Sequence, residues 1–585
     1  MQRYVLKKLR WLWILKEDLK EYVFRRRYPY VGPIYKAKDY TFLPKVTLTS
    51  LTETGRDKST IPVLKQRSYA GRKIISSALA NTRCADLGVE GVLEKLNNTL
   101  YTSYTLDSVI SVLSSYVAQN VDFGTAYAYL RPYWGYISAM EGELSTRKEK
   151  DREMRENVLA DGRITRRHVP PRRLWDLCAN RVVPYWVANC EPWAISHAWV
   201  EEKDRVGVMT SINGCEWPVP MPKDANLDLI RIEMLNLMSK SEPRPKAEYA
   251  WLDVLCLRQE GGKNEHLRLD EWKLDVPTIG SVYEHPWSAV ERSERVVYYL
   301  NGLGRPLRLT PGYFESDRCW FRRAWTLQEI SRNPIIGGET RKNVTDKQVQ
   351  RRFNEQLSSL QRMRRNIWIL DFLSEMRNRV STKPLDIVAG LVYLLRTNTI
   401  PIYDPMQSAE DAWEVLTDVM RPTYRAQLLF FYPEPGNGSK NWCPSWEQLM
   451  TSKTISPRFT GHLSGVENER SADYYMGHFI ESGLVWGLGD VPNELTPRQG
   501  ELVFNDDDGD TCTLKIVADH AYSIPDGVYT LLGCNNVPLS RDHWVVGQMR
   551  QDGRFEKLSV FRSARDEEQH LHHLKLGRLF PIYLC

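Results

Sequence analysis

The segment WAISHAWV, residues 193–200, decides the fold of this chain. It is an apolar and aromatic run interrupted by Ser196 and His197, which is typical of a buried strand. Two similar runs follow, YAWLDVLCL at 249–257 and RVVYYL at 295–300, and the helical pattern LDLIRIEMLNLMSK at 227–240 separates the first two. This alternation predicts an α/β fold in which helices flank a mainly parallel sheet.

The rest of the chain divides around this segment. A length of 585 residues exceeds the roughly 100–200 residues of one domain, so several units are expected. Helical spacing predicts a helical N-terminal region and a helical middle, and short β-branched runs between turn residues predict a β-rich end. The expected boundaries are 1–146 for the helical N-terminal region, 147–171 for a charged linker, 172–332 for the α/β domain, 333–450 for its helical extension and 451–585 for the β-rich region.

Composition argues against several classes of protein. Ten cysteines are scattered without a C-x-x-C pair, and no histidine cluster has zinc spacing, so we expect reduced thiols and no metal. The 79 basic and 73 acidic residues leave a net charge of +6, which is too small to indicate a nucleic-acid partner. No apolar run approaches the roughly 18 residues of a membrane span, and a signal-peptide pattern is missing, so a cytoplasmic protein is expected.

The first thirty residues mix Lys and Arg with Trp11, Trp13, Leu15, Leu19 and Phe24. This pattern is compatible with an amphipathic helix. Residues 1–30 could therefore make peripheral contact with an anionic membrane surface. We favour packing against the body of the protein, which is the ordinary role of an amphipathic helix.

Four blocks follow one another in a fixed order: PPRRLWDL at 170–177, WAISHAWV at 193–200, YAWLDVLCLRQE at 249–260 and CWFRRAWTLQEIS at 319–331. In this order they resemble the heterokaryon incompatibility (HET) domain of filamentous fungi. Together with RVSTKPLDIVAGLVYLLRTNTIPIYDP at 379–405 and WCPSW at 442–446, the resemblance covers about half of the chain. The residues that match the family's motifs are Ser196, His197, Trp199, Trp251, Asp253, Cys256, Gln259, Tyr283, Trp325, Thr326, Gln328 and Glu329. The chain departs from the pattern at Val200 and Ala324, where the family usually has glycine, and at Leu257, where it usually has isoleucine.

The resemblance implies fungal non-self recognition or programmed cell death, and a fold related to Toll/interleukin-1 receptor (TIR) domains. Some TIR domains cleave the glycosidic bond of NAD with a glutamate, which points to Glu329 as the candidate catalytic residue and to NAD as a candidate substrate, with no cofactor required. One carboxylate held against the ribose would stabilise the positive charge that develops there. The alternative is a non-enzymatic TIR-like scaffold that acts by self-association and through protein partners.

The block that contains Glu329 is predicted to be a helix over 318–331, capped by Asp317. Phe321, Ala324, Trp325 and Gln328 fall at i, i+3, i+4 and i+7, so the helix would pack by its aromatic face. In such a helix Trp325 would lie one turn before Glu329 and could border the same pocket. A surface carboxylate is the competing interpretation of Glu329.

Other candidates also have ordinary explanations. For Asp253 we favour a buried acid that accepts backbone N–H bonds over a catalytic role. Cys256 lies in an apolar run, and its spacing does not favour a nucleophile. Ser196 and His197 are neighbours on a strand and face opposite sides, which argues against a Ser–His pair. The tryptophans are expected mostly in the core: Trp199, Trp251, Trp320 and Trp325.

Overall fold

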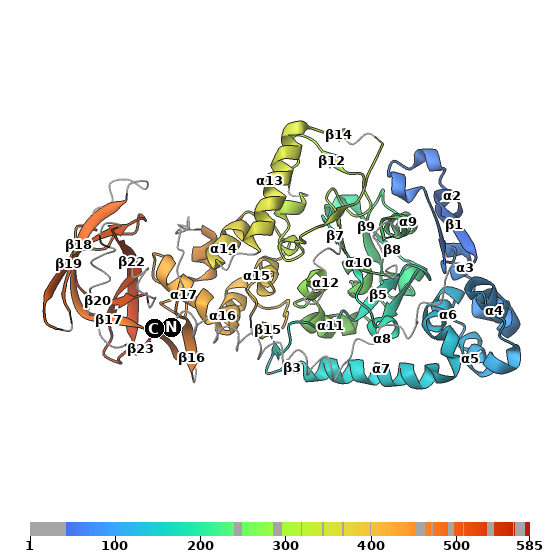
Figure 1. The fold of residues 1–585 in the computed structure, drawn as a ribbon, viewed down its shortest axis with the longest axis horizontal. Coiled ribbons are helices and arrows are strands. Elements are labelled where there is room, and N and C mark those ends of the chain that lie inside the picture. The colour runs from blue at the N-terminus through green and yellow to red at the C-terminus, as the bar shows by residue number, and fades with distance from the viewer. Residues whose placement is uncertain are drawn as a thin grey trace, which may run out of the picture. The chain divides into compact units, whose positions relative to one another are not determined.

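The protein is described by a computed structural model, which forms two compact units, Met1–Asn354 and Glu355–Cys585 (Figure 1). The structure describes residues 43–238, 248–284, 295–316, 319–341, 344–364, 368–397, 399–451, 463–469, 472–489, 497–506, 508–534, 543–564, 567 and 579–585. The predicted amphipathic segment 1–30 and the predicted helix cap Asp317 lie outside these residues. None of the helices formed by the described residues is long and apolar enough to cross a membrane.

A six-stranded sheet lies at the centre of the first unit (Figure 1). Its strands, in spatial order, are β13 (Ile335–Ile336), β11 (Val296–Tyr299), β7 (Trp193–His197), β10 (Tyr249–Leu252), β5 (Arg173–Asp176) and β6 (Arg181–Pro184). The first four strands are parallel to one another. Strand β5 is antiparallel to its two neighbours, β10 and β6. The α/β class is confirmed, and the sheet is mixed.

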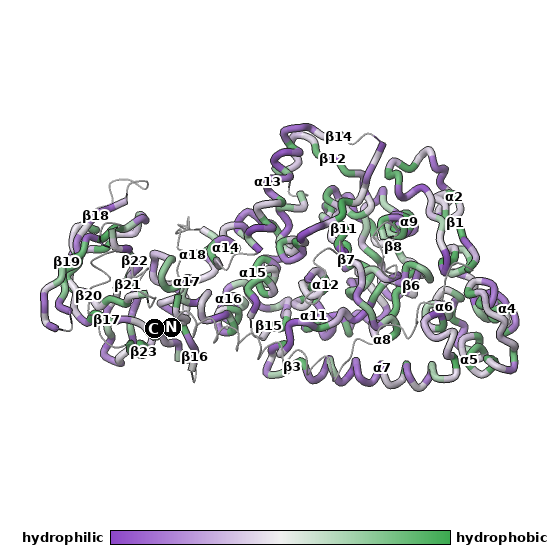
Figure 2. The backbone as a smooth tube through the Cα atoms, viewed as in Figure 1, coloured by the Kyte–Doolittle hydropathy of each residue, from purple (hydrophilic) through white to green (hydrophobic). Residues whose placement is uncertain are grey.

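The apolar runs form strands because both of their faces are covered. Every residue of β7, β10 and β11 is buried, as near-continuous hydrophobic strands require. The predicted helix at 227–240 is present as α9 (Leu227–Met238), which is buried along nearly its whole length. Figure 2 shows the hydrophobic colouring of β7 and β11.

The predicted strand at 249–257 is wrong beyond Leu252. Residues Asp253–Cys256 form a short helix, α10, in which the Leu257 N–H donates to the Asp253 carbonyl at 2.9 Å. The Asp253 side chain also accepts the Val254 N–H at 2.8 Å. These local bonds turn the chain out of the sheet directly after the strand, and they leave Asp253 at its carboxyl end.

Helices and short strands surround the sheet. The N-terminal elements are β1 (Lys45–Thr49), α2 (Ser50–Thr54), β2 (Ser68–Arg72), α3 (Ser77–Ala80), α4 (Cys84–Leu100), α5 (Leu106–Ala118), α6 (Phe123–Leu130), α7 (Ile137–Asn157), β3 (Leu159–Ala160) and β4 (Arg163–Ile164). Later elements are α8 (Tyr185–Ala188), β8 (Arg205–Val208), β9 (Val219–Pro222), α11 (Arg268–Asp275), α12 (Gly280–Tyr283), β12 (Arg308–Leu309) and β14 (Val344–Thr345). The 3₁₀ turns are η2 (Lys58–Thr60), η3 (Leu64–Gln66), η4 (Arg131–Tyr136), η5 (Glu202–Asp204), η6 (Ser211–Asn213), η7 (Glu265–Leu267), η8 (Trp320–Arg322) and η9 (Trp325–Leu327).

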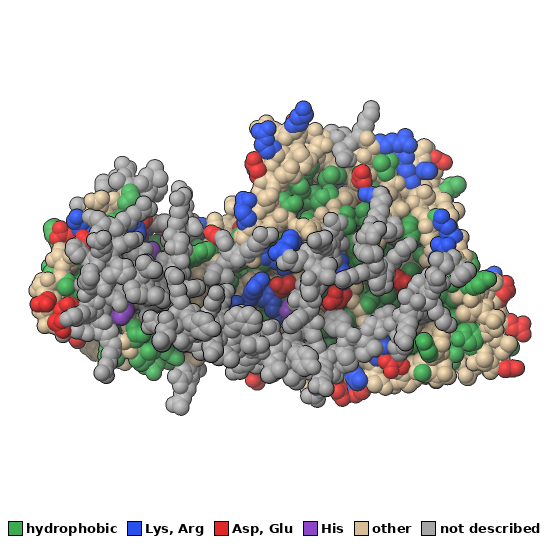
Figure 3. All heavy atoms as spheres, in the orientation of Figure 1, with side chains coloured by type: hydrophobic (Ala, Val, Ile, Leu, Met, Phe, Trp, Pro, Cys, Tyr) green, Lys and Arg blue, Asp and Glu red, His purple; other side chains and the backbone are tan. Residues whose placement is uncertain are grey.

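The described part of the N-terminal region, from residue 43, contains mainly helices together with strands β1 and β2, and it is joined to the sheet by buried charges. Arg131 of η4 donates to Asp176 of β5 at 2.7 Å and also contacts Glu248, which precedes β10. Acidic side chains gather over α4 and α5 on the face seen in Figure 3. Among the acidic residues of α4, Asp86, Glu90 and Glu94 are exposed. Residues 147–157 of the predicted charged linker belong to α7, where i,i+4 ion pairs such as Arg155–Asp151 support the helix.

The second unit combines helices with a β-barrel. Its helical part contains α14 (Ile369–Arg377), α15 (Pro384–Val392), β15 (Ile400–Pro401), α16 (Ala409–Val419), α17 (Pro422–Phe431) and α18 (Trp446–Thr451), and α13 (Lys347–Met363) crosses the boundary between the units. The β-rich end contains β16 (Val466–Glu469), β17 (Ala472–Trp486), β18 (Arg498–Asn505), β19 (Thr511–Ala518), β20 (Gly527–Gly533), β21 (His543–Met549), β22 (Phe555–Ser563) and β23 (Phe580–Tyr583). Strands β17 to β22 pair in an antiparallel ring that closes where β20 pairs with β17. Closure leaves no free edge among these six strands.

Candidate functional site

The candidate site lies where the parallel strands end. Ser196 and His197 are the last two residues of β7, and Asp253 directly follows β10, which pairs in parallel with β7. The carboxyl ends of neighbouring parallel strands meet at one edge of a sheet, where open α/β folds bind ligands. Two blocks of sequence that are more than fifty residues apart therefore meet here.

Ser196 connects this edge to the block that contains Glu329. Its hydroxyl donates to the Glu329 carboxylate and accepts a hydrogen bond from Trp320 Nε1 at 2.7 Å. Tyr298 of β11 stacks on Trp320 with ring centroids 4.6 Å apart and donates to the Glu329 carbonyl at 3.1 Å. Glu329 is only 8% exposed, so the surface-carboxylate interpretation is wrong.

The predicted helix over 318–331 is also wrong. Two 3₁₀ turns, η8 and η9, replace it, and between them Arg323 is extended with φ −84° and ψ 132°. Thr326 Oγ1 donates to the carbonyls of Trp320 and Arg323 at 2.6 and 2.8 Å, which stabilises this break. Glu329 follows in a turn, where its backbone N–H donates to the Thr326 carbonyl at 3.2 Å. Trp325 therefore does not lie one α-helical turn before Glu329.

The second pair at this edge is His197 with Asp253. His197 Nε2 lies 2.8 Å from Asp253 Oδ1, and Trp199 Nε1 donates to Asp253 Oδ2 at 3.0 Å. Burial opposes charge on both groups, but their attraction and hydrogen bond outweigh it, so the pKa of His197 is raised and the pKa of Asp253 is lowered. The Asp253 side chain is 21% exposed and also accepts the backbone N–H of Val254. A hydrogen-bonded histidine–aspartate pair therefore lies beside the buried Glu329.

Tyr283 of α12 lies near both carboxylates. Its hydroxyl donates to the Ile195 carbonyl at 3.1 Å, and its ring meets Trp251 edge-on with centroids 5.9 Å apart. Burial raises the pKa of Tyr283 well above its ordinary value, and the nearby charges of Glu329 and Asp253 raise it further. The phenol is therefore a neutral hydrogen-bond donor at this edge.

The remaining predicted residues are divided between core and surroundings. Cys256 is buried and its pKa is raised to about 12, mainly by burial, which argues against a thiolate nucleophile. Gln259 Nε2 donates to the Leu257 carbonyl at 2.9 Å. The tryptophan predictions hold for the two that are buried, Trp251 and Trp320, whereas Trp199 and Trp325 are half-buried.

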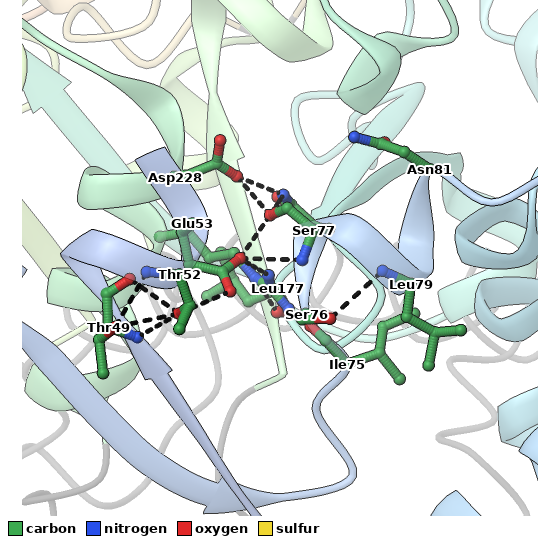
Figure 4. Close-up of polar contacts among 12 residues, drawn as sticks. Thr49, Thr52, Glu53, Ile75, Ser76, Ser77, Leu79, Asn81, Leu177 and Asp228 are labelled. Carbon is green, nitrogen blue, oxygen red and sulfur yellow. Dashed lines mark hydrogen bonds and ion pairs between the residues drawn. The ribbon is translucent and has the colours of Figure 1, made fainter. Parts of the chain in front are cut away.

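A second polar cluster gave no sequence signal. Glu53 of α2 accepts the backbone N–H and the hydroxyl of Ser77 at 2.9 and 2.6 Å, and the same hydroxyl lies 2.7 Å from Asp228 of α9 (Figure 4). Arg231 Nη1 lies 3.7 Å from Glu53, and its other nitrogens donate to the carbonyls of Leu177, Ile75 and Cys178. These bonds join the N-terminal region to α9. No group of three or more His, Cys, Asp or Glu side chains suited to a metal occurs in the described parts of the chain.

A charged groove of about 710 Å³ in the first unit is separate from the strand-end site. Its charges are paired with one another: Arg152 contacts Glu149 and Glu156, and Arg155 donates to Asp151 at 2.9 Å. The residues that line it are Ser145, Lys148, Glu149, Asp151, Arg152, Arg155, Glu156, Leu159, Arg172, Trp186, Asp270 and Leu274. None of the predicted site residues lines it.

Comparisons with protein-family models, with curated proteins and with solved structures find no match for this chain. The functional argument therefore depends on the site itself. Ser196, His197, Asp253 and Glu329 meet at one edge of the sheet. Chemically, this edge offers one buried carboxylic side chain, that of Glu329, and one hydrogen-bonded histidine–aspartate pair.

Proposed function

We propose that this chain is a HET-like effector of non-self recognition or programmed cell death, cytoplasmic, with a TIR-like α/β domain that cleaves NAD at Glu329. The observation that most supports this proposal is the hydrogen bond between Ser196 and Glu329. It joins two blocks of the HET-like pattern that are 133 residues apart, and it does so at the strand ends where α/β folds bind ligands.

The chemistry requires little more than a well-placed carboxylate. The bond between the ribose C1′ and the nicotinamide nitrogen breaks, and its electron pair leaves with neutral nicotinamide. Positive charge then develops on the ribose, where Glu329 would stabilise it. Water adds to C1′ and loses a proton, which completes hydrolysis to ADP-ribose. The carboxylate acts more strongly in a buried site than in water, because the local dielectric is low.

The test is release of nicotinamide from NAD by the purified full chain, over a range of protein concentrations. We expect turnover by the wild type and its loss in Glu329→Gln, which keeps the shape and the bond to Ser196 but removes the charge. Glu94→Gln, at an exposed position of α4, is the matched control and should retain activity. Equal turnover by wild type and Glu329→Gln, with both folded by circular dichroism, would refute the assignment.

A non-enzymatic scaffold is the second candidate. The observation in its favour is that Glu329 is 8% exposed and already bonded to Ser196, which suits a structural link between β7 and the following turn. A scaffold predicts concentration-dependent assembly in light scattering and no NAD turnover by any variant. Turnover abolished by Glu329→Gln would exclude it.

A further inference from the structure

Gln328 is a buried glutamine with an unsatisfied side chain. It is 1% exposed, and within the described parts of the chain neither its Nε2 nor its Oε1 has a hydrogen-bond partner. Native proteins pair nearly all such groups, because an unpaired buried amide loses its bonds to water without replacement. Stability alone therefore does not explain a glutamine at this position.

Another buried glutamine of the same unit behaves differently. Gln66 is 4% exposed, and its Nε2 donates to the Glu233 carboxylate at 2.8 Å and to the Gly304 carbonyl at 2.9 Å. The unpaired state of Gln328 is thus not general for buried amides in this protein.

The backbone at Gln328 is well fixed. Its N–H donates to the Trp325 carbonyl at 3.2 Å, and the next residue, Glu329, is held by bonds from Ser196 and Tyr298. The unpaired amide therefore belongs to the same rigid turn as the candidate catalytic carboxylate. An unpaired, buried and preorganised polar group beside such a carboxylate is typical of a group that orients a ligand.

We propose that Gln328 is a specificity-determining residue that binds the carboxamide of the ligand, which under the proposed function is the nicotinamide group of NAD. A primary amide presents one donor and one acceptor side by side, so its complement is another primary amide. Nε2 would donate to the nicotinamide carbonyl, and Oε1 would accept from the nicotinamide NH₂. Both unpaired atoms of Gln328 gain a partner at once. This inference rests on the proposed function for its ligand, but it has a readout that does not require catalysis.

The experiment measures binding of free nicotinamide and of 3-acetylpyridine to the full chain by titration calorimetry. The two probes differ by NH₂ against CH₃, so only nicotinamide can donate to Oε1. We expect the wild type to prefer nicotinamide by about 10- to 100-fold, the range for one buried hydrogen bond. Gln328→Leu should bind nicotinamide more weakly by a similar factor and lose the preference.

Thermal unfolding without ligand supplies the matched control. Gln328→Leu removes an unpaired amide, so its melting temperature should equal or exceed that of the wild type. The same substitution at Gln66 removes two existing hydrogen bonds and should lower the melting temperature, with the preference for nicotinamide kept.

Three results of the binding and unfolding experiments would overturn the inference: no nicotinamide binding by the wild type, an unchanged preference in Gln328→Leu, or a melting temperature lowered in Gln328→Leu as in Gln66→Leu. The last result would indicate an amide already satisfied by water. NAD turnover with an unchanged KM in Gln328→Leu would reject the role of Gln328 and keep the cleavage activity. A preference lost in Gln328→Leu, without turnover by the wild type, would support Gln328 and reject the cleavage.

Discussion

Lys557 in the barrel strand β22 makes the stability of the second unit depend on pH. The side chain is fully buried, and its Nζ donates to the carbonyls of Tyr432 and Leu428 at 2.6 and 3.4 Å. Burial lowers its pKa from 10.5 to about 7, although Cys443 and Glu434 act in the opposite direction. Above pH 7 the folded protein therefore holds Lys557 mostly as a neutral amine, whereas the unfolded chain holds it as ammonium.

The sign and size of the effect follow from proton linkage. Between pH 7 and pH 10.5 the unfolded chain binds a proton at Lys557 that the folded chain has lost, so the free energy of unfolding rises with pH. One pKa unit corresponds to about 1.4 kcal/mol. Because the folded amine is still half protonated at pH 7, the expected gain up to pH 8.5 is roughly 1.5 kcal/mol.

The assay is urea unfolding of wild type and Lys557→Met at pH 7.0 and 8.5, with the transition of the second unit identified as the one that the substitution shifts. Other titrating groups are common to both proteins, so they cancel in the difference. The two carbonyls that lose their donor in Lys557→Met add an offset that does not depend on pH. The difference in the free energy of unfolding between wild type and Lys557→Met should change between pH 7.0 and 8.5. A change of less than about 0.5 kcal/mol in this difference would refute a lowered pKa at Lys557.

Three further predictions concern the strand-end site. Ser196→Ala leaves the Glu329 carboxylate and a buried indole N–H without their shared partner, so urea unfolding should show a loss of about 1–3 kcal/mol; a loss below 0.5 kcal/mol would contradict the bond. Asp253→Asn should bring the pKa of His197 below 6.5 in an NMR titration, because burial then prevails, and an unchanged pKa of His197 would contradict the pairing. In the wild type this pair stabilises the fold fully below pH 6.5. That stabilisation is lost as the pH rises through the raised pKa of His197. Cys256 should react with iodoacetamide at pH 8 only on unfolding, because burial raises its pKa to about 12, and labelling of the folded protein detected by mass spectrometry would contradict this expectation.

The parts of the fold that sequence predicts are those in which local pattern and burial agree. Strands β7 and β11 are buried on both faces, so their apolar runs identify them directly. Helix α9 begins at its predicted residue. The closed barrel of the second unit was predicted only as a β-rich region, because strand alternation does not determine which strands pair at the point of closure.

The site shows the same limit in its details. His197 meets Asp253 because β7 and β10 are parallel neighbours, and the sequence predicts both strands but neither their order in the sheet nor the end of β10 at Leu252. The failed helix around Glu329 has a different cause: Trp320 contacts Ser196 and Tyr298, and these long-range contacts of a segment built from two 3₁₀ turns leave no periodic signal. The unpaired amide of Gln328 is likewise visible only once its surroundings are known.

The two carboxylates at this edge are partnered in different ways, and the difference bears on mechanism. Asp253 is balanced by His197, so that pair carries little net charge when the imidazole is protonated. Glu329 accepts a hydrogen bond from the hydroxyl of Ser196, which lies on the neighbouring strand β7. A pair of carboxylates that act as acid and nucleophile needs two free groups on opposite sides of the scissile bond. The proposed NAD cleavage needs only one carboxylate beside the ribose to stabilise the cationic ribosyl group, because neutral nicotinamide leaves without needing an acid.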